Sequence, residues 1–519
     1  MRTQLRLVAT LIATGAVADF HSQFTSGSWP GAVGSWRATV SAQAPSSDPQ
    51  RSYERAVSAF ADGRYTEALA GFDDAARTAA GGDGELAVRA RKGSVRAALR
   101  IAEFDRAWRE ARALAETRTS DPEAQALRGD AEWAMGLFDE AEAAYERAAV
   151  LDPAGARARF GIARSLASRS QLRRALDETR LALATAPHDP EAHALAGAIH
   201  ERLLQFEEGA AAYAAYAALL PAAEAPAIVT ARTRAAFLRS FARRPPLAMR
   251  PEDAAAVHTI PFKLVRNKVV IQGRLNGAHV EWVLDTGAER TGISFDLAYR
   301  ARIKTVTSTL TAGVGRASLR RVQLGRADRL EIGTMRMTNV PVSIRDPAAD
   351  GAPRWQGESL SPLPLGLSVV VDYQQRQVTL ARELASEPAG VRLPLRVHRL
   401  PMVRGMLNAA HPAYFIVDTG GEVISISAET ARALGMQPAR RIPLRVFGMS
   451  GLDDSAFLLP GVDLDFSDIE YRNVGLAVLN LRAPSVLLGF QVGGIVGHKF
   501  LGNYRVAMDF VRGEMRLSK

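Results

Sequence analysis

The stretch VEWVLDTGAERTGIS, residues 280–294, places one acid, Asp285, directly after an apolar run and directly before Thr286 and Gly287. The apolar run is typical of a strand that enters a core, and Thr-Gly is typical of a tight turn. The glycine lets the backbone approach closely, so that its amide can donate to the acid, while the threonine hydroxyl can hold the neighbouring loop. One such loop is weak evidence of chemistry, because Asp-Thr-Gly also forms ordinary turns.

The same pattern returns in AYFIVDTGGEVISIS, residues 413–427, with Asp418, Thr419 and Gly420. The two acids lie 133 positions apart (418 − 285). Two copies at equivalent places of a duplicated region are far more specific than one turn.

The flanking sequence indicates such a duplication. IPFKLVRNKVVIQGRLNGAHVEWVLDTGAE lies over LPLRVHRLPMVRGMLNAAHPAYFIVDTGGE, and VVVDYQQRQVTL corresponds to RVAMDFVRGEMRL. Short alternating runs separated by turn residues are typical of an all-β domain. We therefore predict two β lobes, lobe one at residues 258–385 and lobe two at residues 386–519.

A pseudo-twofold axis between the lobes would bring Asp285 and Asp418 face to face. Two carboxylates in contact cannot both ionise cheaply, so they share one proton and titrate as a unit. One acid can then take a proton from a water molecule while the other donates to a carbonyl oxygen. The repeated motif therefore predicts peptide hydrolysis without a covalent intermediate.

The β half resembles the retropepsin-like aspartic proteases, in a single-chain, two-lobed form rather than a homodimer. The resemblance covers about residues 258–519 and rests on apolar-Asp-Thr-Gly twice, with Ala288 after the first copy. It implies that Asp285 and Asp418 are the catalytic residues. Four further residues would hold the catalytic loops: Thr286, Gly287, Thr419 and Gly420.

Proteases of this family also carry a glycine-rich hairpin flap that closes over the substrate. TAGVGRAS stands at the right distance in lobe one, and VFGMSGLDD stands correspondingly in lobe two. The flap and substrate-binding residues that the resemblance implies are Gly313, Val314, Gly315, Gly448 and Met449.

Two places depart from the family pattern. The family threads its catalytic loop with an apolar-apolar-Gly strand, which lobe two supplies as Ile495-Val496-Gly497, whereas lobe one has GESLSPLPLG there. Lobe two in turn has Gly421 where Ala, Ser or Thr is expected after the motif. These departures leave three alternatives open: one degenerate lobe of which only the aspartate is needed, a retained fold without activity, or lobes that pair between chains.

The chain before the β half is rich in alanine and helical in period. Phe104, Phe138, Leu172 and Phe206 lie 34 residues apart (138 − 104, 172 − 138, 206 − 172). This period resembles the tetratricopeptide repeat, whose units stack into a curved solenoid. We predict about five units in an all-α solenoid over residues 50–222. Such solenoids usually bind peptides or partner proteins, and a passive spacer is the alternative.

A proline-containing linker is expected at residues 223–257, where FARRPPLAMRPEDAAAV interrupts the helical pattern. At the other end, MRTQLRLVATLIATGAVADF has the basic, apolar and small-residue regions of a secretory signal peptide. We assign the signal to residues 1–18 and a flexible segment to residues 19–49. An uncleaved anchor is the alternative. The expected location is periplasmic or secreted.

The composition excludes several kinds of site. The chain has no cysteine, so disulfides, thiolate chemistry and cysteine-based zinc sites are impossible. No His-Glu-x-x-His motif is present, and we expect no metal and no cofactor. The formal net charge of +10 comes from scattered arginines without an aromatic platform, which favours a solvated surface over a nucleic-acid partner.

These features together predict an extracytoplasmic aspartic endopeptidase that acts on a peptide or protein substrate, with the repeats recruiting that substrate or a protein partner. The alternative is a non-catalytic, repeat-based scaffold or adaptor with a degenerate protease domain. Beyond a possible uncleaved signal anchor, the sequence contains no run of a length that could span a membrane.

Overall fold

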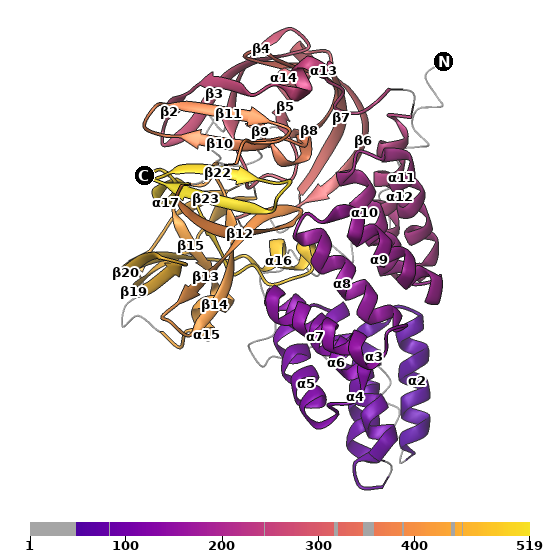
Figure 1. Ribbon diagram of the computed structural model, residues 1–519. Helices are drawn as coiled ribbons and strands as arrows, with labels where there is room; N and C mark the ends of the chain where they lie inside the picture. Colours follow the sequence, from indigo (N-terminus) through magenta and orange to yellow (C-terminus); the bar gives the residue numbers. More distant parts are fainter. Residues whose placement is uncertain are drawn as a thin grey trace.

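The structure is a computed structural model, in which a helical solenoid lies beside two β lobes (Figure 1). The predicted fold class, an all-α repeat solenoid followed by a bilobal all-β region, is confirmed. The predicted signal peptide and the flexible segment up to residue 47 lie outside the described residues, as does Met449. The described residues are 48–82, 84–242, 244–315, 320–345, 358–386, 389–436, 442–448 and 450–519.

Five antiparallel helix pairs form the solenoid in the described part of the chain. The first helices of the pairs are α2 (Pro49–Ala61), α4 (Gly84–Arg100), α6 (Pro122–Ala134), α8 (Ala156–Ser168) and α10 (Pro190–Arg202). The second helices are α3 (Tyr65–Ala79), α5 (Phe104–Thr117), α7 (Phe138–Leu151), α9 (Leu172–Thr185) and α11 (Phe206–Leu219). The residues that recur every 34 positions thus each begin the second helix of a pair.

Small residues allow the helices of neighbouring repeats to pack closely. Tyr145 of α7 is fully buried between Gly129 of α6 and Gly161 of α8. A Cβ atom added to Gly129 or Gly161 would lie 2.5 Å or 2.2 Å from the tyrosine ring, so only glycine fits. Local sequence also determines where helices begin. At the start of α6, Asp121 accepts hydrogen bonds from the N–H groups of two first-turn residues, and Pro122 occupies the first helical position.

The prediction of a linker at residues 223–257 is wrong for much of that segment. Helix α12 (Ala225–Arg239) lies inside it and packs on α11, with Phe237 and Phe241 in one apolar cluster with Phe206. Pro226, which precedes the prolines that predicted the linker, lies in the first turn of α12, where a helix tolerates proline. A short helix, α13 (Pro251–Ala255), follows before the first strand.

Lobe one is built on an eight-stranded sheet with the order β2-β3-β4-β9-β5-β8-β7-β6. Helix α14 (Phe295–Arg300) follows β5, and a 3₁₀ turn at Leu363–Leu365 follows β9. The strands are β2 (Lys263–Val265), β3 (Lys268–Leu275), β4 (Ala278–Leu284), β5 (Gly292–Ser294), β6 (Lys304–Thr311), β7 (Arg320–Ile332), β8 (Met335–Arg345) and β9 (Glu358–Leu360).

Lobe two repeats this arrangement, with its catalytic-loop strands in the order β13-β14-β21-β15-β20-β19-β16 and a separate hairpin of β17 and β18. Its helices are α15 (Ala428–Ala433), α16 (Arg482–Leu488) and α17 (His498–Leu501). The strands are β13 (Leu400–Leu407), β14 (His411–Val417), β15 (Ile424–Ser427), β16 (Ile442–Pro443), β17 (Val446–Gly448), β18 (Gly451–Asp453), β19 (Phe457–Phe466), β20 (Ile469–Leu479) and β21 (Gly494–Val496).

The two lobes share one sheet, in which lobe-one strands β1-β11-β10 continue into lobe-two strands β22-β23-β12. At the centre β10 pairs antiparallel with β22, with Val370 opposite Ala507. Because the two strands come from the matching segments of the duplication, the pseudo-twofold axis passes between them. The strands are β1 (His258–Pro261), β10 (Ser368–Asp372), β11 (Gln377–Ala381), β12 (Val391–His398), β22 (Arg505–Asp509) and β23 (Glu514–Ser518).

The solenoid packs directly against lobe two, as Figure 1 shows for α8 and β12. Trp133 and Phe138 share a buried cluster with Tyr414 and Phe490, and the rings of Phe138 and Tyr414 lie 4.8 Å apart. Asp139 accepts hydrogen bonds from Arg404 at 2.7 Å and from Tyr414 at 2.9 Å. The interface is therefore a continuous core with charged pairs at its edge.

Candidate active site

Each acid of the repeated motif lies at the end of a strand that a second strand flanks in parallel. In lobe two, β21 runs parallel to β14, and the N–H of Asp418 donates to Val496 O at 3.0 Å. In lobe one, β9 runs parallel to β4, and the N–H of Asp285 donates to Leu360 O at 2.9 Å. Part of the unusual GESLSPLPLG segment, Glu358–Leu360, therefore forms the threading strand, and the alternative of a degenerate first lobe finds no support in its backbone.

The two threonines hold the loops together across the lobes. Thr286 Oγ1 donates to Val417 O at 2.6 Å, and Thr419 Oγ1 donates to Leu284 O at 2.7 Å. Each hydroxyl also accepts the N–H of the other threonine at 3.1 Å. Both side chains are fully buried, so water does not compete for these bonds.

The two glycines bring each acid against the opposite loop. A Cβ atom added to Gly287 would lie 2.4 Å from Cγ of Asp418, and one added to Gly420 would lie 2.8 Å from Cγ of Asp285. The acids therefore face each other within one chain. The lobes in this structure pair within the chain rather than between chains. Sequence reasoning placed all six residues of the two motifs at this site, and the structure brings them together.

Asp418 is held by its own loop. The N–H groups of Gly420 and Gly421 both donate to its Oδ1, at 2.8 Å and 2.9 Å. Burial and, next, the negative charge of Asp285 raise the pKa of Asp418 to about 7, against the opposite effect of Lys268 and of the glycine amides. The departure at Gly421 has a local reason, because a Cβ atom there would lie 2.7 Å from Asp418 Oδ2.

Asp285 is held by a side chain instead. Ser359 Oγ, from the threading strand β9, donates to Asp285 Oδ2 at 2.8 Å. Two residues further on, Ser361 Oγ donates to Ala288 O at 2.6 Å and braces the same loop. The serines that look like defects in the sequence are therefore part of the site.

Charged side chains from each lobe reach the catalytic loop of the other. Lys268, at the start of β3, donates to the carbonyl oxygen of Gly420, and Arg399 pairs with Glu289 at 2.7 Å. Glu289 is four residues after Asp285 in the catalytic loop of lobe one. Both pairs cross the pseudo-twofold axis, so they fix the two loops relative to each other.

The tips of the two flap segments meet. The N–H of Gly313 donates to Ser450 Oγ at 3.1 Å, and the N–H of Ser450 donates to Val314 O at 2.9 Å. A Cβ atom added to Gly315 or Gly448 would lie 2.3 Å from the opposite tip, which explains both glycines. Of the five predicted flap residues, Met449 lies outside the described residues.

Sequence reasoning missed five residues of this site: Lys268, Ser359, Ser361, Arg399 and Ser450. One sequence feature could have indicated charged pairs around the loops: Glu289 and Glu422 occupy matching positions of the duplication. Ser359 had a signal too, since it replaces an apolar residue in the threading strand. Lys268 and Ser450 contact residues of the opposite lobe, and the linear sequence does not show that these residues lie close together.

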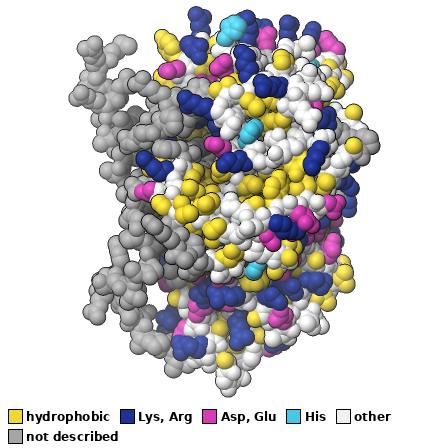
Figure 2. All heavy atoms as spheres, turned by 90° about the vertical axis from the view of Figure 1, so that its left-hand side faces the viewer, with side chains coloured by type: hydrophobic (Ala, Val, Ile, Leu, Met, Phe, Trp, Pro, Cys, Tyr) yellow, Lys and Arg dark blue, Asp and Glu magenta, His cyan; other side chains and the backbone are white. Residues whose placement is uncertain are grey.

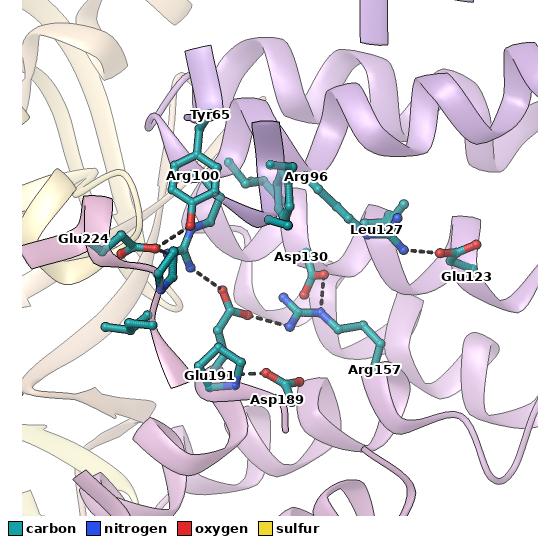
Figure 3. A pocket seen from close by; sticks show the side chains of 16 residues that line it. Tyr65, Arg96, Arg100, Glu123, Leu127, Asp130, Arg157, Asp189, Glu191 and Glu224 are labelled. Atoms are coloured by element: carbon teal, nitrogen blue, oxygen red, sulfur yellow. Dashed lines mark hydrogen bonds and ion pairs between the residues drawn. The ribbon is translucent and has the colours of Figure 1, made fainter. Parts of the chain in front are cut away.

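A hollow of about 350 Å³ lies in the solenoid, away from the two acids (Figure 3). Its charged side chains pair with one another: Arg157 binds Glu191 at 2.5 Å and Asp130 at 2.6 Å, while Arg100 binds Glu191 at 3.3 Å and also Glu224. The charges of Arg157 and Arg100 lower the pKa of Glu191 to about 2, although burial opposes this. The rest of the wall is mostly apolar.

The surface and the composition of the described residues give little sign of other sites. On the face in Figure 2, Lys and Arg side chains are spread among acidic and apolar ones. Over the described ranges, no group of three or more His, Asp or Glu side chains could hold a metal ion. No helix in those ranges combines the length and apolar character needed to cross a membrane.

Comparison with known protein families matches part of each half. Residues 271–369 match the family model described as aspartyl protease, and residues 18–84, 93–156 and 127–190 match the tetratricopeptide repeat model. No curated protein matches the chain.

Several repeat proteins are among the solved structures similar to this chain. TTC0263, a thermophilic repeat protein of Thermus thermophilus, is 18% identical, with 37% of this chain and 100% of that chain covered and a TM-score of 0.31. MamA of Desulfovibrio magneticus is 16% identical, with 34% and 97% covered and a TM-score of 0.25. YrrB, described as a repeat protein with an unusual peptide-binding site, is 16% identical, with 36% and 92% covered and a TM-score of 0.23. By the two family-model matches alone, the chain carries a retropepsin-like aspartyl protease domain at residues 271–369 together with N-terminal tetratricopeptide repeats.

Proposed function

We propose that the protein is an extracytoplasmic aspartic endopeptidase that hydrolyses peptide bonds with a water molecule activated between Asp285 and Asp418. The observation that carries the proposal is the reciprocal placement of the acids, each against the glycine of the opposite loop. A pKa of about 7 for Asp418 supports it, because the pair then holds one shared proton in the neutral and mildly acidic range.

The chemistry needs one protonated and one ionised acid. The ionised acid accepts a proton from water as the water oxygen bonds to the peptide carbonyl carbon, and the other acid donates its proton to the carbonyl oxygen. The resulting gem-diol collapses with breakage of the C–N bond. The leaving nitrogen takes the proton from the first acid, and a diol proton returns to the second acid, so the pair regains its starting state.

Substrate entry requires the flap tips to separate. In the structure the tips are joined by the two hydrogen bonds between Ser450 and the Gly313–Val314 segment. A peptide that enters between them would replace these bonds with bonds to its own backbone, and closure would then exclude water from the reacting bond.

For the repeats we propose a role in recruiting substrate or a protein partner. The hollow in Figure 3 supports this, because its wall is mostly apolar and a peptide side chain could bury there. Its arginines are already paired with acids, so we expect apolar contacts rather than charge to provide the affinity. The periplasmic or secreted location rests on the signal-peptide pattern of residues 1–18.

The proposed activity is tested by incubating the full chain with a reduced, unfolded protein between pH 4 and pH 8 and identifying the products by mass spectrometry. Wild type should produce cleaved peptides, while Asp285→Asn and Asp418→Asn should reduce the rate by at least about a thousandfold, as loss of an essential acid does. A statine-type inhibitor should also block wild type. A matched control is Asp509→Asn, which changes a buried acid that caps the turn after β22 and lies outside the dyad.

The alternative, a non-catalytic scaffold or adaptor, predicts a different result. Wild type and Asp418→Asn would then show equal and negligible cleavage at every pH. The serine and the prolines of lobe one were the sequence features that favoured this alternative. Ser359 lies in a threading strand with the same pairing as its partner in lobe two, and the prolines lie in the turn that follows that strand.

A further inference from the structure

The two catalytic loops carry different side chains at one equivalent position. Arg290 stands five residues after Asp285, and Val423 stands five residues after Asp418 (290 − 285, 423 − 418). Both side chains are partly exposed. Because the pseudo-twofold axis relates the two loops, these side chains lie on opposite sides of the paired acids. The duplication therefore places a cation on the lobe-one side of the site and an apolar group on the lobe-two side.

The lobe-two side of the site is aliphatic. Side chains from the flap of lobe one, from the catalytic loop, from β17 and from the threading strand β21 are partly buried there and pack against one apolar cluster: Val314, Val423, Val446 and Ile495. That cluster includes Ile416, which stands two residues before Asp418. The apolar surface beside Asp418 therefore fits an aliphatic side chain of a substrate.

The equivalent positions of lobe one are polar. Ser359 stands in the middle of its threading strand, where lobe two has Ile495. Thr311 stands two residues before the first flap glycine of lobe one, as Val446 does in lobe two. With Arg290 in the catalytic loop, lobe one therefore offers polar groups at the places where lobe two offers aliphatic ones.

The Arg290 guanidinium lies among other charged groups. Arg234 and Arg399 repel it, while Glu289 and Glu201 attract it. Both acids are already paired, Glu289 with Arg399 at 2.7 Å and Glu201 with Arg234 at 2.7 Å. Among the described residues, no hydrogen bond or ion pair engages Arg290 itself. Three guanidinium groups thus face two carboxylates, and one positive charge is left over.

A carboxylate of the substrate would complete this group of charges. The planar guanidinium can donate two parallel hydrogen bonds to a carboxylate. A partly buried charge also gains more from an opposite charge than a fully solvated one does. An extended peptide held between the acids and the flaps would pass both catalytic loops. Its side chains on the two sides of the scissile bond would then meet Arg290 and Val423 separately.

Resting on the aspartic-peptidase function proposed above, we propose that Arg290 and Val423 determine which substrates are cleaved. Arg290 binds the carboxylate of a glutamate or aspartate side chain on one side of the scissile bond. Val423, with the aliphatic side chains around it, binds an aliphatic side chain on the other side. The substrate class is therefore a peptide segment that carries an acidic and an aliphatic residue on opposite sides of the cleaved bond.

The experiment is cleavage of a peptide library by the full chain, with the products identified by mass spectrometry. Wild type should select glutamate or aspartate at one position on one side of the cleaved bond, and valine, isoleucine or leucine on the other side. Exchange of the selected acid for its amide should lower kcat/KM by about tenfold or more, as the loss of a hydrogen bond between charged groups implies.

Three variants assign the acidic preference to one side chain. Arg290→Val copies the residue of lobe two and should cleave the acid and amide peptides at equal rates, with the aliphatic preference on the other side retained. Arg290→Glu reverses the charge and should select lysine or arginine at the same position. Arg300→Val is the matched control, because it removes an exposed arginine from α14 of the same lobe and should keep the wild-type profile.

Three results would overturn the inference: a wild type without an acidic preference, an acidic preference that survives in Arg290→Val, or acidic and aliphatic preferences on the same side of the bond. If wild type cleaves no peptide, the proposed activity fails instead, and binding decides the inference.

Binding is measured by fluorescence anisotropy with labelled octapeptides, in which a single glutamate is moved along a sequence of alanine and valine. Each octapeptide has a matched version with glutamine. The best glutamate peptide should bind wild type about tenfold more tightly than its glutamine version, and Arg290→Val should bind both equally. Equal binding of the two versions to wild type would contradict the role of Arg290.

Discussion

At the scale of single residues, atoms of the opposite lobe explain why each motif requires glycine after Asp-Thr. A side chain on Gly420 would meet the Asp285 carboxyl group, which no rearrangement of the same loop could avoid. We predict that Gly420→Ala lowers the free energy of unfolding by about 1–3 kcal/mol and abolishes cleavage, because overpacking separates the acids. Urea denaturation and the cleavage assay measure the two effects.

The control for this substitution is Gly82→Ala. Gly82 lies in the turn after α3, and a Cβ atom there would have no neighbour within 4 Å. Gly82→Ala should change neither stability nor cleavage by a measurable amount. An equal effect of the two substitutions would mean that the Asp285–Gly420 contact has no special importance.

A second residue-scale prediction concerns the pH dependence of stability. Because folding raises the pKa of Asp418 from 3.8 to about 7, the folded chain holds this proton over a range where the unfolded chain has lost it. Wild type therefore loses stability through this group as the pH rises from about 4 to about 7. Asp418→Asn has no such charge. Its unfolding temperature relative to wild type should rise over this interval, and a constant difference between the two proteins would contradict the raised pKa.

At the scale of elements, the sequence was sufficient for those whose signals are local. The 34-residue period identified the repeat helices, and the matched segments around Asp285 and Asp418 identified both lobes. The sequence was misleading for the segment after the repeats, where α12 occupies much of the length that the prolines further on marked as a linker. It was also misleading for GESLSPLPLG, whose Ser359 lies in a strand, β9, that pairs with β4 because of the fold. Such pairing is a tertiary effect that overrides local preference.

The flap tips give an element-scale prediction. Ser450→Ala removes the acceptor of the Gly313 N–H, so the tips should separate more often. We expect amide hydrogen exchange in the segment that contains Gly313 to become about tenfold faster, as the loss of one hydrogen bond of about 1.4 kcal/mol implies. Ser455→Ala is the matched control, because the Ser455 hydroxyl bonds Asp453 within the same lobe. Unchanged exchange in Ser450→Ala would show that other contacts hold the flaps closed.

At the scale of the whole molecule, the solenoid is not an arm on a flexible tether. Its α7 side chains complete a core with lobe two, and α12 continues it to lobe one, where Arg326 of β7 donates to Ser240 O at 2.8 Å. This interface could not be predicted from the sequence, because Phe138 and Trp133 fit the repeat pattern whether or not a second domain covers them. Removal of the repeats would expose this apolar surface, so the protease half is expected to aggregate when it is expressed alone.

The shared core predicts that both halves unfold together. Phe138→Ala deletes a fully buried ring that contacts Tyr414 and Phe490, and should lower the free energy of unfolding by about 3–5 kcal/mol. Calorimetry should show one transition for wild type and a lower, still common, transition for the variant. Val150→Ala, on an 81% exposed side chain of the same helix, is the control and should change stability by less than about 0.5 kcal/mol. A variant in which only the solenoid melts earlier would contradict the shared core.

The proposed activity requires the two catalytic loops to meet within one chain, and a cross-link tests this most directly. The chain has no cysteine, so the double variant Gly287→Cys with Asp418→Cys has no competing thiol. A Cβ atom on Gly287 would lie 2.9 Å from the Cβ of Asp418, close to disulfide range once the loops relax. We predict that mild oxidation gives an intrachain disulfide, seen by mass spectrometry as one peptide pair in a monomer. Two free thiols in the folded protein, or a disulfide between two chains, would contradict the account.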